Sequence, residues 1–345
     1  MRKEAYLAKP LSGDTVQCQT CEHFCAVKPG EAGKCGVRRN VDGSLYLVVY
    51  GEAIAVHVDP IEKKPLFHFM PGGDALSIGT YGCNFRCPFC QNWQMSQVRS
   101  FDDRGDYLGQ SAMPEVLVDT CLKNNIPIIA YTYNEPTIFF EYTYDTARLA
   151  TDAGLANVYV TNGYMTGEML EMMHPYLDAA NVDLKGFRDE VYRRYAGARL
   201  QPVLDSMKKM KQLGIWVEVT TLIIPGINDD ARELQDAAHF VADELGLETP
   251  WHLSRFTPAY QMADVPPTPI ATLLQAQAYG REAGLRYVYV GNVPGEANTT
   301  CHVCSHLLIR RRGYQVVAND VAPGGHCPEC GTPVAGRGMA GAAGS

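Results

Sequence analysis

The sequence lacks any apolar run long enough to cross a bilayer. Its longest, such as VEVTTLIIPG, falls well short of the roughly 20 residues that a spanning helix needs. The amino-terminal stretch MRKEAYLAKPLSG has neither an apolar core nor a cleavage signal. Net charge is −8 without a long basic stretch, which disfavours nucleic acid as the main partner but leaves a local basic patch open. We therefore expect a soluble, cytoplasmic protein with no membrane partner.

The chain is also without a glycine-rich G-x-G-x-x-G turn after its first predicted barrel strand, which argues against a dinucleotide-binding fold. From Asp74 onward, short apolar runs alternate with amphipathic segments. This alternation predicts an α/β fold with a parallel sheet and helical crossovers, and six or seven units indicate a partial or full barrel rather than an open doubly wound sheet. The partial (β/α)6 TIM-like form is what the family resemblance described below implies. The predicted strands are 75–80, 126–133, 157–162, 179–185, 215–224, 251–256 and 287–292, and the predicted helices include 137–153, 201–213, 230–245 and 269–283.

The composition changes along the chain suggest four regions. Residues 1–73 form a Cys-rich, metal-binding and β-hairpin region, with two short strands expected within 43–58. Residues 74–296 form the barrel, and residues 297–333 form a four-cysteine zinc ribbon. The Gly/Ala-rich tail 334–345 is predicted to be disordered.

What the sequence has in abundance is cysteine. Twelve cysteines without a secretory signal indicate metal ligands rather than disulfides. Cys121 lies in the helix-like run PEVLVDTCLKNN and is interpreted as an inert core residue. The others form three groups: Cys18, Cys21, Cys25 and Cys35; Cys83, Cys87 and Cys90; and Cys301, Cys304, Cys327 and Cys330.

The middle group stops at three cysteines, within GTYGCNFRCPFC, directly after the first predicted barrel strand. Barrel enzymes carry their chemistry at the carboxyl ends of the strands, so this loop is expected at the catalytic rim. A [4Fe–4S] cluster held by three thiolates leaves one iron open to a substrate or cofactor. A zinc site completed by a distant residue is the alternative.

This loop, C-x3-C-x2-C with Phe89 before the last cysteine, resembles the cluster motif of the radical S-adenosylmethionine (SAM) superfamily. The resemblance implies that SAM chelates the fourth iron and that Phe89 packs near its adenine. It also implies that an electron from the cluster cleaves SAM to methionine and a 5′-deoxyadenosyl radical, which abstracts hydrogen from a substrate. A donor such as flavodoxin or ferredoxin would supply that electron.

Later strand ends extend the resemblance. YTYNEP is similar to a Gly-Gly-Glu-Pro-like segment that touches the amino group of SAM, with its glycines replaced. VTNG and VDLKG look like segments of the activating enzymes of glycyl radical proteins. The implied SAM-binding residues are Asn134, Glu135, Thr161, Asn162, Asp183, Lys185 and, from a sixth-strand match, His252.

Each of these residues alone has a plainer interpretation. Asp183 and Lys185 would make an ion pair at a strand end, and Thr161 and Asn162 would cap a helix. His252 alone would be a satisfied buried histidine. Their joint occurrence at successive strand ends, beside the cysteine loop, favours function.

The flanking cysteine groups differ in their signals. The C-x2-C knuckles CHVC and CPEC are typical of a structural zinc ribbon, which lets a small module fold without a large core. The amino-terminal C-x2-C-x3-C-x9-C spacing is compatible with one metal site. Zinc is the first interpretation there, with a second iron–sulfur cluster or unligated cysteines as alternatives, and His23 is a substitute ligand.

Together with VDPIEKKPLFHFMPG, these flanks extend the resemblance to nearly the whole chain. The chain closely resembles the radical SAM enzymes of the AmmeMemoRadiSam system, which are similar to pyruvate formate-lyase activating enzymes. This implies an oxidoreductase, with activation of a glycyl radical protein as the leading hypothesis. The alternatives are a radical SAM enzyme that modifies a small molecule, RNA or another protein, and a non-catalytic, metal-stabilised binding scaffold.

Overall fold

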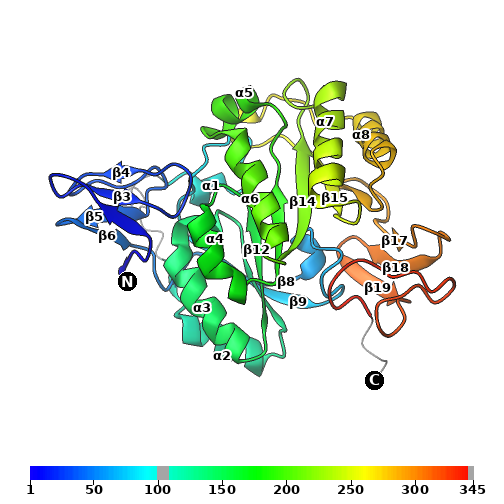
Figure 1. Cartoon of the computed structure of the whole chain (residues 1–345), viewed down its shortest axis with the longest axis horizontal. Coiled ribbons are helices and arrows are strands. Elements are labelled where there is room, and N and C mark those ends of the chain that lie inside the picture. The colour runs from blue at the N-terminus through cyan, green and yellow to red at the C-terminus, as the bar shows by residue number, and fades with distance from the viewer. Residues whose placement is uncertain (99–108, 341–345) are drawn as a thin grey trace.

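The computed structural model describes residues 1–98 and 109–340 and is built around one eight-stranded sheet, shown in Figure 1. The strand order is β16-β15-β14-β13-β12-β11-β9-β8, and every pair is parallel except β8 with β9. Its strands are β8 (Ala55–Pro60), β9 (Asp74–Gly79), β11 (Ile128–Tyr131), β12 (Ala156–Thr161), β13 (Ala179–Asp183), β14 (Trp216–Ile223), β15 (Trp251–Arg255) and β16 (Val288–Gly291).

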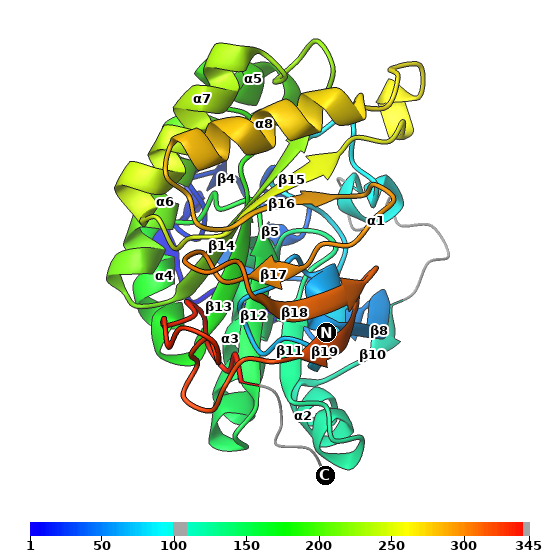
Figure 2. The same cartoon turned by 90° about the vertical axis from the view of Figure 1, so that its right-hand side faces the viewer.

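Each parallel strand lies next to the one before it in the chain, so the sheet grows at one edge only, from β9 to β16. This order is that of a barrel and differs from that of a doubly wound sheet. Helices cover the outer face, which Figure 2 shows from the side. They are α2 (Pro114–Lys123), α3 (Phe140–Asp152), α4 (Gly167–Met173), α5 (Asp189–Val191), α6 (Leu200–Gln212), α7 (Ala231–Phe240) and α8 (Ile270–Glu282). The short α1 (Trp93–Ser96) instead follows the cysteine loop at the carboxyl ends of the strands. The predicted α/β fold with a partial barrel is confirmed, and each predicted strand and helix has its counterpart.

The strands are nearly all apolar because both of their faces are buried. On β11, Ile129 and Tyr131 pack in the main core with the helices, whereas Ile128 and Ala130 face a smaller cluster on the other side. Cys121 on α2 is fully buried in the main core, as predicted. Among the helices of the described residues, none has the length and apolar character that crossing a membrane requires.

The connector between β8 and β9 fills the amino-terminal end of the partial barrel. Leu66 and Phe69 pack on residues at the starts of several strands, among them Ile128. The buried Glu218 carboxylate of β14 anchors the connector, because it accepts hydrogen bonds from the backbone N–H groups of Phe67 at 3.0 Å and His68 at 2.7 Å. The other end of the barrel, where the strands finish, is left for the cysteine loop.

One edge of this connector carries a buried ion pair that makes stability depend on pH. Burial alone would raise the pKa of the Asp59 carboxyl, but hydrogen bonds from Lys63 and Lys64, each at 2.7 Å, hold it well below its usual range. The hydroxyl of Tyr133 donates a third bond at 2.9 Å. The unfolded chain therefore binds the proton more readily, and this contribution to stability is present above about pH 4 and is lost as pH falls.

We expect Asp59→Asn to lower the free energy of unfolding by about 1–3 kcal/mol at pH 7, because it leaves the buried Lys64 ammonium without its partner. The difference from the unsubstituted chain should shrink as pH falls below about 4, as followed by urea titrations at several pH values. Asp119→Asn is the matched control, since Asp119 is 66% exposed in its pair with Lys123. A difference that stays constant down to pH 2 would contradict this assignment.

The amino-terminal region consists of two small sheets, ordered β1-β6-β5 and β2-β3-β4. A buried ion pair fastens this region to the barrel: Arg38 donates to both carboxylate oxygens of Glu141 on α3, at 3.1 and 2.6 Å. The strands are β1 (Lys3–Glu4), β2 (Ala8–Pro10), β3 (Val16–Cys18), β4 (Ala26–Val27), β5 (Arg38–Val41), β6 (Ser44–Leu47) and β7 (Glu52–Ala53), which pairs with β10 (Gln110–Ser111). Strand β8, from the same predicted region, instead extends the barrel sheet.

The carboxyl-terminal module is a sheet of β17 (Thr299–Thr300), β18 (Leu307–Arg312) and β19 (Gln315–Asn319). Arg311, fully buried, ties it to the connector: its guanidinium donates to Glu62 and to the carbonyl of Phe67. The prediction of disorder from residue 334 is wrong for 334–340. Met339 is buried in the module core. Arg337 forms an isolated β-bridge with Phe69 of the connector, and its side chain donates to the carbonyls of Asp178 and Gly214 in the barrel. Residues 341–345 lie outside the described residues.

Candidate active site

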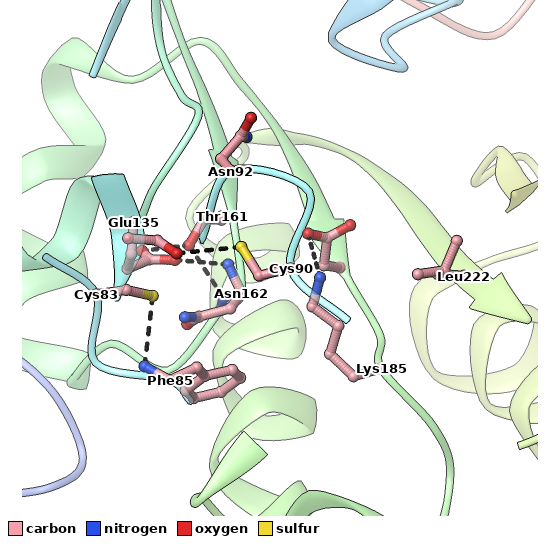
Figure 3. A network of polar contacts seen from close by, with 12 residues as sticks. Cys83, Phe85, Cys90, Asn92, Glu135, Thr161, Asn162, Lys185 and Leu222 are labelled. Carbon is pink, nitrogen blue, oxygen red and sulfur yellow. Dashed lines mark hydrogen bonds and ion pairs between the residues drawn. The ribbon is translucent and has the colours of Figure 1, made fainter. Parts of the chain in front are cut away.

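The three-cysteine loop follows β9 and opens on a cavity at the carboxyl ends of the strands, about 740 Å³ in volume including its opening to solvent. Figure 3 shows how the side chains of this site converge. Of the predicted site residues, the lining includes Cys83, Cys87, Phe89, Cys90, Asn134, Glu135, Asn162, Asp183 and Lys185. The fold therefore brings together residues from four successive strand ends.

Asn134 shapes the cysteine loop rather than presenting its amide to the cavity. Its side-chain nitrogen donates to the Thr80 hydroxyl at 3.1 Å and to the Gly82 carbonyl at 3.0 Å. Its side-chain oxygen accepts from the Thr80 backbone N–H at 3.2 Å. Asn134 thus fixes the start of the loop that carries Cys83, and its predicted contact with SAM stays a prediction.

The donor set fits a cluster better than a single ion. Within residues 1–98 and 109–340, the three loop sulfurs are not among the groups whose ligand atoms all lie within 4.8 Å of one another. In a [4Fe–4S] cluster each thiolate binds a different iron, so its sulfurs stay farther apart than around one ion. Burial raises the pKa of the Cys87 thiol to about 12, so coordination to a metal would be needed to ionise it at neutral pH.

Glu135 is fully buried and bridges two strand ends. One carboxylate oxygen accepts from the Thr137 N–H at 3.0 Å, the Thr137 hydroxyl at 2.6 Å and the Thr161 hydroxyl at 2.7 Å. The other accepts from the Asn162 backbone N–H at 2.7 Å. Glu135 and Thr161 hold the ends of β11 and β12 together. Glu135 also lines the cavity, so its predicted contact with SAM stays a prediction, whereas Thr161 is not among the lining residues.

We expect Glu135→Ala to lower the free energy of unfolding by about 3 kcal/mol, because buried donors on Thr137 and Asn162 lose their acceptor. Urea denaturation at neutral pH measures the loss. Glu115→Ala, on the exposed side of α2, is the control and should change stability by less than about 0.5 kcal/mol. Equal effects of the two substitutions would contradict the bridging role.

Tyr133 has a backbone conformation that favours glycine, with φ of 71°. It stands at the first glycine of the Gly-Gly-Glu-Pro-like segment that YTYNEP resembles. A non-glycine residue in this region costs about 1–3 kcal/mol. Tyr133 is held there by the side chain of Asn92, which donates to its carbonyl at 2.7 Å, and by its own hydroxyl bond to Asp59. This strand-end turn is therefore formed without a glycine at its positive-φ position.

Asp183 and Lys185 follow β13 and form an ion pair at 2.7 Å on the cavity wall. Both remain partly accessible, with side-chain exposures of 29% and 18%. Burial opposes the charge on Lys185, but the neighbouring Asp183 carboxylate raises the pKa of its ammonium above the usual value. The ion-pair interpretation and the binding interpretation are thus compatible. The pair uses one N–H of the ammonium and one oxygen of the carboxylate, and an ammonium has three N–H groups and a carboxylate two oxygens.

His252 does not reach the cavity. Its ring nitrogen lies 2.7 Å from the Glu218 carboxylate, and its ring packs against Phe67 and Tyr289 near the starts of the strands. The interpretation of His252 as a SAM contact is corrected here, because β15 places its second residue at the end of the barrel away from the cysteine loop.

The structure adds cavity residues that the sequence reasoning missed. Ser96 on α1 places its hydroxyl 3.1 Å from the Cys90 sulfur, and Leu222 of β14 closes the opposite side. Gln91 and Asn92 directly follow the last cysteine, so proximity to the motif was the signal that could have found them. No comparable local signal marks Ser96 or Leu222.

The fold and the site define a class: a partial-barrel protein in which three closely spaced cysteines line a cavity at the carboxyl ends of the strands. Residues 77–240 match the radical SAM superfamily. An uncharacterized protein of Methanocaldococcus jannaschii is 47% identical over 90% of this chain and 91% of its own length. The pyruvate formate-lyase-activating enzyme of Clostridium pasteurianum is 21% identical over 48% of this chain and 69% of its own.

Solved structures share the fold. Streptococcus suis SuiB bound to S-adenosylmethionine superposes with a TM-score of 0.51 at 10% identity, covering 68% of this chain and 53% of SuiB. A radical SAM methyltransferase from Sphaerobacter thermophilus gives 0.50 at 15% identity, covering 66% and 68%. The chain belongs to the radical SAM superfamily and is similar to the pyruvate formate-lyase activating enzymes.

Proposed function

We propose that this chain cleaves SAM reductively and directs the resulting radical to a hydrogen of its substrate. Cys83, Cys87 and Cys90 would hold a [4Fe–4S] cluster whose fourth iron stays open to SAM. When bound, the cluster supplies one electron to SAM, which yields methionine and a 5′-deoxyadenosyl radical. The observation that carries the proposal is the three-cysteine loop opening on a cavity of about 740 Å³ at the carboxyl ends of a parallel partial barrel.

The residues around the loop have separate tasks in this proposal. Asn134 and Glu135 keep the loop and the strand ends in register, through the hydrogen bonds described above. Lys185 offers N–H groups to a carboxylate, and Asp183 offers an acceptor to a ribose hydroxyl. Phe89, 4% exposed at the cavity edge, offers an aromatic face to a purine.

A direct assay tests the reaction. The anaerobically reconstituted protein, given SAM and dithionite as the reductant, should form 5′-deoxyadenosine and methionine in equal amounts, measured by liquid chromatography. A reconstituted protein that forms neither product, with its cluster shown intact by absorption spectroscopy, would refute the proposal. That result would favour the binding-scaffold hypothesis instead.

For the substrate, we propose a backbone Cα–H of a glycyl radical protein. The support is the similarity to the Clostridium pasteurianum enzyme and to the (2S)-3-sulfopropanediol dehydratase activating enzyme of Klebsiella oxytoca, which is 21% identical over 32% of this chain. A glycyl doublet in electron paramagnetic resonance, on mixing with a glycyl radical protein of the host, would support it. SAM cleavage without that doublet for every such host protein would refute it and favour another substrate.

The carboxyl-terminal module has a structural role in this proposal. Its four cysteine sulfurs all lie within 4.8 Å of one another, which fits a single tetrahedral ion, and we propose zinc. The module contacts the connector at the amino-terminal end of the barrel, away from the cysteine loop. It therefore supports the scaffold and does not contribute to the cavity.

A further inference from the structure

The four amino-terminal cysteines line one small cavity between the amino-terminal region and the rim of the barrel. The cavity, about 320 Å³ including its opening, is lined by Cys18, Cys21, Cys25 and Cys35. Thr137 and Ile138, which follow β11, close it from the barrel side. All four cysteines therefore line one space, although Cys18 and Cys35 lie 17 positions apart in the chain.

The spacing of these sulfurs differs from that of the carboxyl-terminal set. Zinc–sulfur bonds of about 2.3 Å place tetrahedral thiolates roughly 3.8 Å apart. The carboxyl-terminal cysteines are built that way, with 3.6 Å between Cys301 and Cys330 and 3.6 Å between Cys304 and Cys327. Among the described residues theirs is the one group whose ligand atoms all lie within 4.8 Å of one another, so neither the amino-terminal cysteines nor the loop cysteines meet that criterion.

His23 does not complete a smaller ligand set. Its Nε2 lies 2.9 Å from the Asn84 carbonyl oxygen, and its Nδ1 lies 3.3 Å from the Lys34 ammonium. Both ring nitrogens thus have partners, and the earlier interpretation of His23 as a substitute for a thiolate finds no support in this geometry. The cavity offers four sulfurs as its ligand atoms.

A buried, unpartnered donor lies in the same cavity wall. Asn84 is 2% exposed, and its side-chain oxygen accepts from the Asn162 amide at 2.7 Å. Its side-chain N–H₂ has no hydrogen-bond partner among the described residues. Leaving such a donor unsatisfied costs about 1–3 kcal/mol, so an occupant with acceptor atoms is expected beside it. Cluster sulfurs accept hydrogen bonds of this kind.

The wall also carries positive charge. Lys34 and the buried guanidinium of Arg38 line the cavity, although the charge of Arg38 is shared with its ion-pair partner Glu141. A four-thiolate iron–sulfur cluster is an anion, and buried anions require nearby cations or donors. The wall therefore carries charge of the sign that such a cluster needs, chiefly from Lys34.

We propose that Cys18, Cys21, Cys25 and Cys35 bind a second [4Fe–4S] cluster, closed by four thiolates, beside the catalytic loop. With every iron ligated by protein, this cluster cannot bind SAM and has a structural or electron-carrying role. It adjoins the loop directly: Asn84 follows Cys83, and a Cβ added to Gly82 would lie 2.3 Å from the Cys35 carbonyl oxygen. This inference does not depend on the proposed catalytic reaction.

A loop-cysteine variant isolates the second site. The full chain carrying Cys83→Ala, Cys87→Ala and Cys90→Ala, reconstituted anaerobically with iron and sulfide, should retain about four iron and four sulfide per chain. Its reduced paramagnetic resonance signal should not respond to SAM. A folded variant, judged by circular dichroism, that contains no iron, or that holds a second zinc ion instead, would overturn the proposal.

The reciprocal variant checks the ligands. Serine at Cys18, Cys21, Cys25 and Cys35 should remove about half of the iron of the reconstituted chain, while a signal that responds to SAM remains. An undiminished iron content would overturn the proposal. If this variant fails to fold, the loop-cysteine variant alone tests whether the second cluster exists. That test requires no turnover, so its outcome does not depend on whether the unsubstituted chain cleaves SAM.

The Asn84 donor gives a third readout, in the loop-cysteine background. An N–H donor to a cluster sulfur stabilises the reduced, more negative state, so Asn84→Leu should make the reduction potential of the cluster more negative. Asn124→Leu, at the exposed end of α2, is the control and should leave the potential unchanged. An unshifted potential in Asn84→Leu would contradict the contact between Asn84 and the cluster.

Discussion

Replacing Cys83 with alanine should reduce 5′-deoxyadenosine formation by more than about 100-fold. Replacing a residue that only hydrogen-bonds to a metal ligand typically costs roughly 10- to 100-fold in metal affinity or activity. Cys83 is itself one of the three proposed ligands in the loop, so its loss should cost more. The proposed cluster would keep two ligands, so we also expect its iron to be lost during purification. Product formation and iron content, measured on the same reconstituted sample, check both effects.

The fold should survive this change. Cys83 lies in a loop whose shape is set by Asn134 and by contacts of its backbone, such as the bonds to the Gly82 carbonyl and from the Arg86 N–H to the Ala196 carbonyl. These contacts do not use the thiol. The far-ultraviolet circular dichroism of the variant should therefore match that of the unsubstituted chain.

Cys121→Ala is the matched control, because Cys121 is also a buried cysteine but lies in the core on α2. It should lose about 1 kcal/mol of stability through a small cavity and keep its activity within a few-fold. Normal turnover in Cys83→Ala would rule out the proposed cluster, whereas equal losses in both variants would indicate a general effect of damaged packing.

Removing one thiolate from the carboxyl-terminal module should have the largest effect on stability. Cys327→Ala leaves three of four sulfurs, and the binding of structural zinc is worth on the order of 10 kcal/mol in small four-ligand modules. The module's own core is small, with few buried apolar residues such as Leu308 and Ile309, so it cannot compensate. We expect loss of zinc and rapid amide hydrogen exchange across 299–319.

The damage should reach the connector, because the buried Arg311 joins the module to Glu62 and to the Phe67 carbonyl. When the module loosens, Arg311 no longer contacts Glu62, and the fully buried Glu62 carboxylate is left without its cation. Exchange should therefore rise in residues 61–69 as well. The cysteine loop lies at the other end of the barrel, and its exchange should change least.

Val303→Ala is the control for this experiment. Val303 lies between two cysteines of the same knuckle and is 63% exposed, so zinc content and exchange should stay as in the unsubstituted chain. Cys327→Ala could also keep its zinc and its slow amide exchange. In that case either the zinc is not held by all four cysteines, or the fold of the module does not depend on the zinc.

The sequence by itself determined the features that depend on local spacing. Alternating apolar and amphipathic runs located the seven parallel strands, and C-x3-C-x2-C at the end of β9 located the candidate catalytic loop. The two C-x2-C knuckles located the four-sulfur group of the carboxyl-terminal module. In each case the residues that make the feature are neighbours in the chain or repeat with the period of one element, so their pattern is visible without the fold.

Only the tertiary structure decided what each polar side chain contacts. Asn134 reaches back 52 residues to Gly82, Asn162 reaches Asn84 over 78, and Arg38 meets Glu141 over 103. Such contacts depend on which strand ends lie side by side and on which way each side chain points. For the same reason the sequence could not show that His252 faces Glu218 at the far end of the barrel, or that the amino-terminal cysteines lie against the catalytic loop.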